Sequence, residues 1–231
     1  MADQKKIANK IQVAILAIFI VFMPLGSWYY LQTGFNYHDS LMSELKDYGK
    51  VPGFALLTQN NDTLTDADLH GKIMIANFYN NESPLSAPSM DYARRILGQF
   101  KSQKDFIFLF HSLKPEDASS LKAMSEKEEL TEKRAYFLSG DEDQMDRIIN
   151  SGYKIPLFDE RNEDGTLSFQ SNVSTLPSAY PYFVLIDSSL TIRNYYYIND
   201  QSSMDRLVEH LAIILPRDVR AKAEYKPPKE M

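Results

Sequence analysis

The stretch at residues 71–88, GKIMIANFYNNESPLSAP, decides the fold of this chain. Its first half, residues 73–79, is an apolar run without polar alternation, which is typical of a strand covered on both faces inside a sheet. The polar residues 80–82 end this strand, and Pro84 and Pro88 indicate the start of a helix, because proline is tolerated in a first helical turn. The stretch therefore predicts a buried strand that leads to a helix N-terminus, where free amides favour an anion or a thiolate.

The next two segments of the chain predict a parallel core. Residues 89–100 carry apolar side chains at three-and-four spacing, which indicates a helix with one buried face. The apolar run at residues 106–110 predicts the next buried strand. Because a strand, a helix and a strand in succession form a crossover, we expect the two strands to be parallel.

Turn formers and capping residues outline the other elements. Residues 51–58 and 63–65 flank Asn60-Asn61-Asp62, which predicts an N-terminal hairpin. The middle of the chain predicts a helix over 118–130, a short strand from 136 with a turn at Gly140, and a helix capped by Asp141 with Gln144. The remaining predictions are an excursion loop over 156–177, a strand pair at 182–187 and 191–197, and a last helix opened by Ser202 with Asp205.

Two groups of residues resemble known families. Residues 68–72, followed by a strand that ends in Asn77-Phe-Tyr, resemble the thioredoxin-like superfamily. Residues 83–88, Ser-Pro-Leu-Ser-Ala-Pro, are similar to the Cys-Pro-x-x-Cys-Pro motif of the Sco (SenC) family, and residues 136–153 are similar to a second pattern of that family. The resemblance covers about residues 51–215 and implies an α/β fold, a thioredoxin-like sandwich with an N-terminal β-hairpin.

The resemblance also implies a chemistry whose residues are replaced here. Sco proteins are membrane-anchored copper chaperones and thiol oxidoreductases that help to assemble the copper centre of cytochrome oxidase. By this resemblance the motif cysteines fall at Ser83 and Ala87 and the third ligand, a histidine, at or near Ala179, and the chain contains no cysteine. Because Cu(I) needs soft sulfur or imidazole ligands, we expect a degenerate site with no metal, no cofactor and no catalysis.

The N-terminus predicts a membrane anchor. Three lysines within residues 5–10 precede an apolar run at 11–31, which is close to the roughly 20 residues that cross a bilayer. The positive-inside bias then predicts a cytoplasmic N-terminus with the rest of the chain outside, and a cleaved signal peptide is the alternative. We expect the membrane to be a bacterial inner membrane and the domain to be periplasmic. The expected organisation is an N-terminal segment 1–10, a transmembrane helix 11–31, a linker 32–50, a thioredoxin-like domain 51–216 and a flexible tail 217–231.

Composition excludes some partners. A formal net charge of -6 and a pI near 5.3 argue against a broad basic face for nucleic acid, because phosphate affinity comes mainly from neutralising that charge. A chain of 231 residues with 44% hydrophobic content is sufficient for one domain of ordinary size. We expect one membrane-attached domain and a protein partner.

Three residues are candidates for binding that partner. His111 follows a predicted parallel strand at its carboxyl end, where open α/β sheets bind ligands; a histidine satisfied by the backbone is the alternative. Tyr180 and Pro181 stand at the place of the cis-proline of thioredoxin folds. A cis bond there would leave backbone groups open to an extended segment, whereas a trans proline at a strand start is the alternative.

The sequence therefore favours a membrane-anchored, non-catalytic binding or assembly factor for cytochrome oxidase or an envelope protein. A metal carrier that uses His111, Met90 and His70 is one alternative, although methionines on a strand or helix are more often core residues. A structural tether is the other.

Overall fold

The computed structural model describes residues 2–80, 86–153 and 180–216, and the chain divides into two compact units, residues 1–44 and 45–231. The first unit is one helix, α1 (Ala2–Glu44), with Pro24 inside it. Large apolar side chains between Leu16 and Phe35 are more than half exposed.

The predicted membrane span at residues 11–31 lies within α1. Among the described residues, no helix is both long and apolar enough to cross a membrane. The side chains of residues 1–15 and 17 lie outside the described part of the chain.

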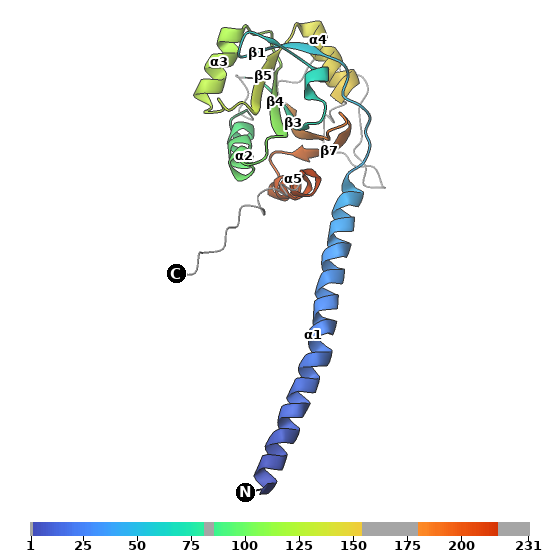
Figure 1. Ribbon diagram of the computed structural model, residues 1–231. Helices are drawn as coiled ribbons and strands as arrows, with labels where there is room; N and C mark the ends of the chain where they lie inside the picture. The colour runs from blue at the N-terminus through green and yellow to red at the C-terminus, as the bar shows by residue number, and fades with distance from the viewer. Residues whose placement is uncertain (1, 81–85, 154–179, 217–231) are drawn as a thin grey trace. The chain divides into compact units, whose positions relative to one another are not determined.

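The second unit is built on a seven-stranded sheet with the strand order β2-β1-β5-β4-β3-β6-β7 (Figure 1). The three inner strands β3 (Ile73–Tyr79), β4 (Phe106–Ser112) and β5 (Ala135–Ser139) are parallel to one another. The antiparallel strands around them are β1 (Ala55–Thr58), β2 (Thr63–Thr65), β6 (Tyr180–Ile186) and β7 (Ile192–Tyr197).

The strand predicted at residues 73–79 is confirmed. Every residue of β3 is buried, and the strand lies between β4 and β6. Its register with β4 runs from Ile73 opposite Phe106 to Tyr79 opposite Ser112, which confirms the predicted parallel crossover. The predicted N-terminal hairpin is confirmed as β1 and β2, with Asn61 at a φ of 60° in its turn.

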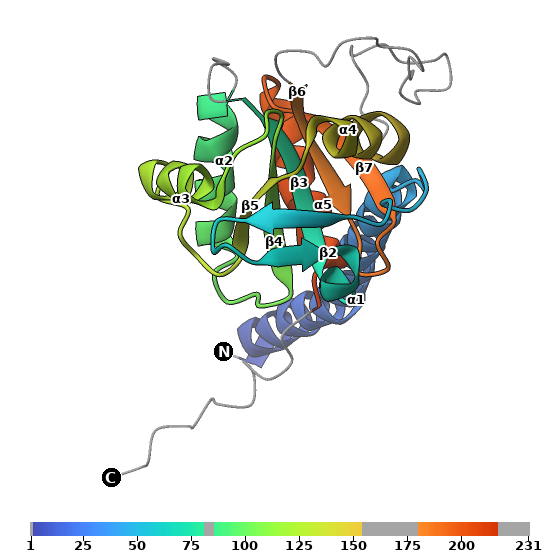
Figure 2. The same cartoon turned by 90° about the horizontal axis from the view of Figure 1, so that it is seen from above.

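Helices cover both faces of the sheet (Figures 1 and 2). One core cluster is formed with buried side chains of α2 (Ser86–Gln99), α3 (Ala118–Lys127) and α5 (Gln201–Ile214). The cluster on the other face is formed with the 3-10 helix η1 (Asp66–Leu69), with α4 (Glu142–Asp146) and with the π-helix η2 (Arg147–Tyr153). This arrangement confirms the predicted thioredoxin-like sandwich.

The predicted linker at residues 32–50 has two parts in the structure. Residues 32–44 belong to α1, and residues 45–50 lie along β7. Lys46 N donates to Arg193 O at 3.0 Å, and Tyr48 N donates to Ile192 O at 3.0 Å. These bonds join the chain to the first two residues of β7, so residues 45–50 belong to the domain.

Two helix ends differ from the prediction. α3 ends at Lys127 rather than 130, because Glu129 has a φ of 54° that a helix cannot continue. α5 is capped by Asp200 rather than opened by Ser202, since the Asp200 carboxylate accepts from the N–H groups of Ser202 and Ser203. The capping box of Asp141 with Gln144 is confirmed. The predicted loop at 156–177 and the tail at 217–231 lie outside the described residues.

Candidate functional site

The start of α2 is the position at which the family motif was expected. Ser86 Oγ donates to Asn80 O at 2.6 Å, and Ser89 Oγ donates to Ser86 O at 2.7 Å. Ala87 is exposed and Pro88 is half-buried in the same turn. The hydroxyls here satisfy backbone carbonyls, as expected for polar residues at a helix start. Ala87 offers only a methyl group to solvent.

The other two degenerate positions, Ser83 and Ala179, lie outside the described residues. The structure therefore places only Ala87 of the three. Their convergence around one pocket stays a prediction.

Pro181 is the second residue of β6, whereas the sequence predicted that the strand begins at residue 182. No peptide bond between described residues is cis, so the cis proline considered at this position is absent. The carbonyl of Pro181 accepts from Ile198 N at 2.8 Å, and Pro181 is half-buried. Tyr180 pairs opposite Phe78 across an irregular step of the β3 and β6 ladder. Partner binding at Tyr180 and Pro181 stays a prediction.

His111 is fully buried, with 0% of its surface exposed, on the face of the sheet that η2 covers. Its ring stacks on Phe78 with centroids 4.9 Å apart, and its edge faces Phe54. Nε2 shares a hydrogen bond of 3.3 Å with the hydroxyl of Tyr153, and Nδ1 has no hydrogen-bond partner among the described residues. The histidine is thus satisfied on one nitrogen, by a side chain rather than by the backbone.

Burial controls the protonation of this pair. Loss of solvent lowers the pKa of His111 to about 3, because the charged imidazolium is disfavoured in an apolar site. Burial likewise raises the pKa of Tyr153. Tyr195 fixes the backbone of Tyr153, since its hydroxyl donates to Tyr153 O at 2.6 Å. The pair is neutral at neutral pH.

The proposed alternative ligands do not come together. Met90 is buried in the core cluster under α2, whereas His111 contacts residues of the other cluster, across the sheet. His70 is exposed just before β3, and His111 lies near the opposite end of the β3 and β4 ladder. In the part of the chain that the structure describes, no group of three His, Cys, Asp or Glu side chains is arranged to hold a metal ion.

Sequence reasoning missed a polar cluster at the carboxyl ends of the parallel strands. Ser112 Oγ donates to Glu116 Oε1 at 2.9 Å, and Glu116 N donates to Ser139 Oγ at 2.8 Å. Burial, with the charge of Glu116, raises the pKa of Tyr79. The signal was available, because β3, β4 and β5 each end in a hydroxyl-bearing residue at one edge of the sheet.

The family model for SCO1/SenC matches residues 43–213, which is most of the chain and all of the described strands. This chain belongs to the SCO1/SenC family. No curated protein sequence matches it significantly.

Several solved structures have the same fold as this SCO1/SenC chain. The SCO1/SenC family lipoprotein from Bacillus anthracis has a TM-score of 0.55 and 17% identity, covering 73% of this chain and 97% of that one. Yeast Sco1 with copper bound has a TM-score of 0.52 and 18% identity, covering 77% and 96%. BsSco, described as a member of the Sco family of cytochrome c oxidase assembly proteins, has a TM-score of 0.54 and 15% identity, covering 73% and 95%.

Proposed function

We propose that this SCO1/SenC chain is a non-catalytic assembly factor that acts by binding a protein partner during maturation of cytochrome oxidase or another envelope protein. The observation that carries the proposal is the lack of any cysteine in 231 residues of a chain that belongs to this family. A thiolate is required both for thiol exchange and as a soft ligand for Cu(I). A serine hydroxyl at position 83 and a methyl group at position 87 supply neither.

The geometry favours the binding of a protein partner over a metal site made of His111, Met90 and His70. His111 and Met90 lie on opposite faces of the sheet, and His70 lies toward the other end of the strands. A metal carrier needs several ligands that converge on one ion. The fold itself is retained, with a packed core on each face of the sheet.

The proposal includes attachment to a bacterial inner membrane, with the domain on the periplasmic side. It is supported by the lysines before residue 11 and by exposed apolar side chains of α1 such as Phe22 and Trp28. Cell fractionation with alkaline extraction tests this part. Recovery of the chain in the soluble fraction contradicts the attachment and leaves the binding role to be judged separately.

Deletion of the gene tests the assembly role. We expect lower content and activity of cytochrome oxidase in the membranes of the deletion strain, restored by the full-length chain. The variant Ser83→Ala should restore oxidase as well as the native chain does, because the proposal assigns no chemistry to that hydroxyl. Unchanged oxidase content after deletion contradicts the oxidase version of the proposal.

Anaerobic Cu(I) titration separates binding from metal carriage. We expect no stoichiometric binding by the full-length chain, and the same result for His111→Leu. The matched control restores the family ligands by Ser83→Cys, Ala87→Cys and Ala179→His, and it should gain tight Cu(I) binding if the three positions converge. Stoichiometric binding by the native chain that His111→Leu abolishes would establish the metal carrier instead.

A further inference from the structure

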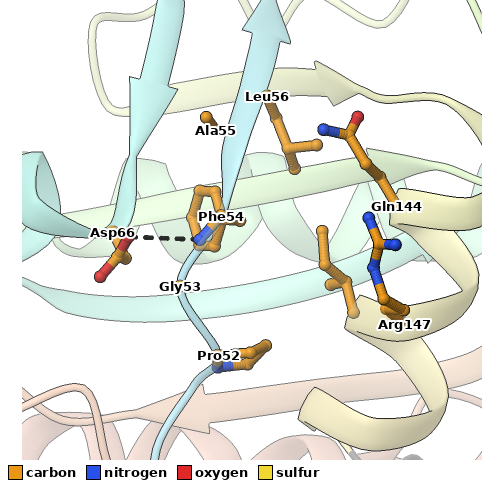
Figure 3. A pocket seen from close by; sticks show the side chains of 9 residues that line it. Pro52, Gly53, Phe54, Ala55, Leu56, Asp66, Gln144 and Arg147 are labelled. Atoms are coloured by element: carbon orange, nitrogen blue, oxygen red, sulfur yellow. Dashed lines mark hydrogen bonds between the residues drawn. The ribbon is translucent and has the colours of Figure 1, made fainter.

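A cavity of about 580 Å³ opens between β1 and the α4–η2 segment (Figure 3). Its volume lies within the roughly 300–1,000 Å³ that is usual for ligand sites. Buried side chains of Phe54, Leu56 and Ile148 form an apolar floor, and the backbone of residues 52–55 forms one wall. The cavity shares no residue with the start of α2.

The wall made by β1 is an open strand edge. Asp66 N donates to Phe54 O at 3.4 Å and Thr58 N donates to Asp62 O at 2.9 Å, so the backbone groups of residues 54, 56 and 58 point toward β2. The alternating groups of Ala55 and Leu57 therefore point the other way. Leu57 pairs with Ser139, the last residue of β5, and Ala55 lies beyond that strand's end. Within the described chain, the N–H and C=O of Ala55 face the cavity without a strand partner.

The two sides of the cavity carry opposite charges (Figure 3). Arg147 and Gln144 point into it from the α4–η2 segment, and no ion pair or hydrogen bond of the Arg147 guanidinium is found among the described residues. Asp66 lies on the far side of β1, where Oδ1 accepts from Phe54 N at 3.2 Å. An anion is therefore favoured only at the Arg147 end. The amide of Gln144 beside it adds a donor of the kind that carboxylates accept.

Close packing at Gly140 and Gly152 holds the two walls of the cavity, β1 and the α4–η2 segment, against each other. A Cβ at Gly140 would lie 2.8 Å from Leu56 Cδ2 and 2.8 Å from Gln144 Oε1. A Cβ at Gly152, in the π-helix, would overlap the ring of Pro52. The edge of β1 at Ala55 and the α4–η2 segment are thus held in place before any ligand binds. This packing lowers the entropic cost of binding.

We propose that this cavity binds the carboxyl terminus of an extended peptide from a protein partner. The peptide adds main-chain hydrogen bonds to Ala55, as in strand addition, and places its terminal carboxylate against Arg147 and Gln144. Its last apolar side chain packs on Leu56 and Ile148. This inference deepens the proposed function, on which it rests for the existence of a protein partner, by naming the part of the partner that is bound.

Titration of the full-length, 15N-labelled chain in detergent micelles tests the proposal. The probes are N-acetyl tripeptides Ala-Val-Xaa, with Leu, Phe or Ala as the last residue, each as the free acid and as the C-terminal amide. We expect the amide signal of Ala55 to shift, and the best free acid to bind about ten-fold more tightly than its amide, because hydrogen bonds to a charged group are the stronger ones.

Arg147→Gln is the decisive variant, and Arg95→Gln on α2 is its matched control. Both arginines are exposed, so both variants should fold. We expect Arg147→Gln to reduce the preference for the acid to less than about three-fold and Arg95→Gln to keep it. Equal affinities for acid and amide, a preference that survives in Arg147→Gln, or no shift at Ala55 with any probe overturns the proposal. If the native chain supports oxidase assembly while these probes fail, the peptide site is wrong and the assembly role stands.

Discussion

The two faces of the sheet use their polar groups differently near the carboxyl ends of the parallel strands. Under α2, the hydroxyls of Ser86 and Ser89 donate to backbone carbonyls, and Ala87 exposes a methyl group. On the other face, His111 keeps one nitrogen without a partner among the described residues, and Arg147 points into an open cavity. The described hydroxyls at the start of α2 are thus used within the backbone, whereas the polar groups across the sheet include ones without a partner among the described residues.

The largest expected effect tests how tightly the cavity face is packed. Gly152→Ala forces a methyl group into the ring of Pro52, so we expect the free energy of unfolding to fall by about 2–3 kcal/mol in urea denaturation. Gly98→Ala, on α2, is the control with nothing within 4 Å of the new methyl group, and it should raise stability by about 0.5–1 kcal/mol. Similar small changes in the free energy of unfolding for Gly152→Ala and Gly98→Ala would contradict the closer packing of the cavity face.

The next effect concerns pH. In the folded chain burial lowers the pKa of His111 to about 3 from 6.5, so the unfolded chain takes up the proton first as pH falls. The stability that the neutral histidine contributes is complete above about pH 6.5 and is lost toward pH 3, by about 1.4 kcal/mol per pH unit.

His111→Leu removes this pH dependence. Urea denaturation between pH 7 and about pH 4.5 should show a flatter loss of stability for His111→Leu than for the native chain. The exposed His70→Gln is the control and should keep the native slope. Parallel curves for the native chain and His111→Leu would mean that the imidazole is not held neutral.

The smallest effects are expected at the start of α2. Ser89→Ala removes one buried hydrogen bond and should lower stability by about 1 kcal/mol. Ala87→Ser, at the exposed position in the same turn, should change stability by less than about 0.5 kcal/mol. A large loss in Ala87→Ser, measured in the same urea assay, would show that position 87 is packed rather than exposed.

Much of the fold was predictable because its signals are local. Neighbouring residues alone indicate three elements: β3 by its apolar run, α2 by the spacing of its apolar residues, and α4 by the capping box of Asp141 with Gln144. The cavity was not predictable, because it depends on the register that pairs Ser139, the last residue of β5, with Leu57 and leaves Ala55 beyond the end of that strand. The pairing of His111 with Tyr153 joins residues 42 positions apart and has no signal in either segment.

The first residue of the π-helix η2 is Arg147, which lines the cavity, and its last residue is Tyr153, which hydrogen-bonds to His111. One wide helical segment therefore supplies a residue to each. An α-helix advances by about 100° per residue, and a wide turn accommodates one residue more without rotating the residues after it. Loss of a single codon between these two residues would therefore remove the wide turn and leave a regular helix without turning the arginine or the tyrosine away from its place.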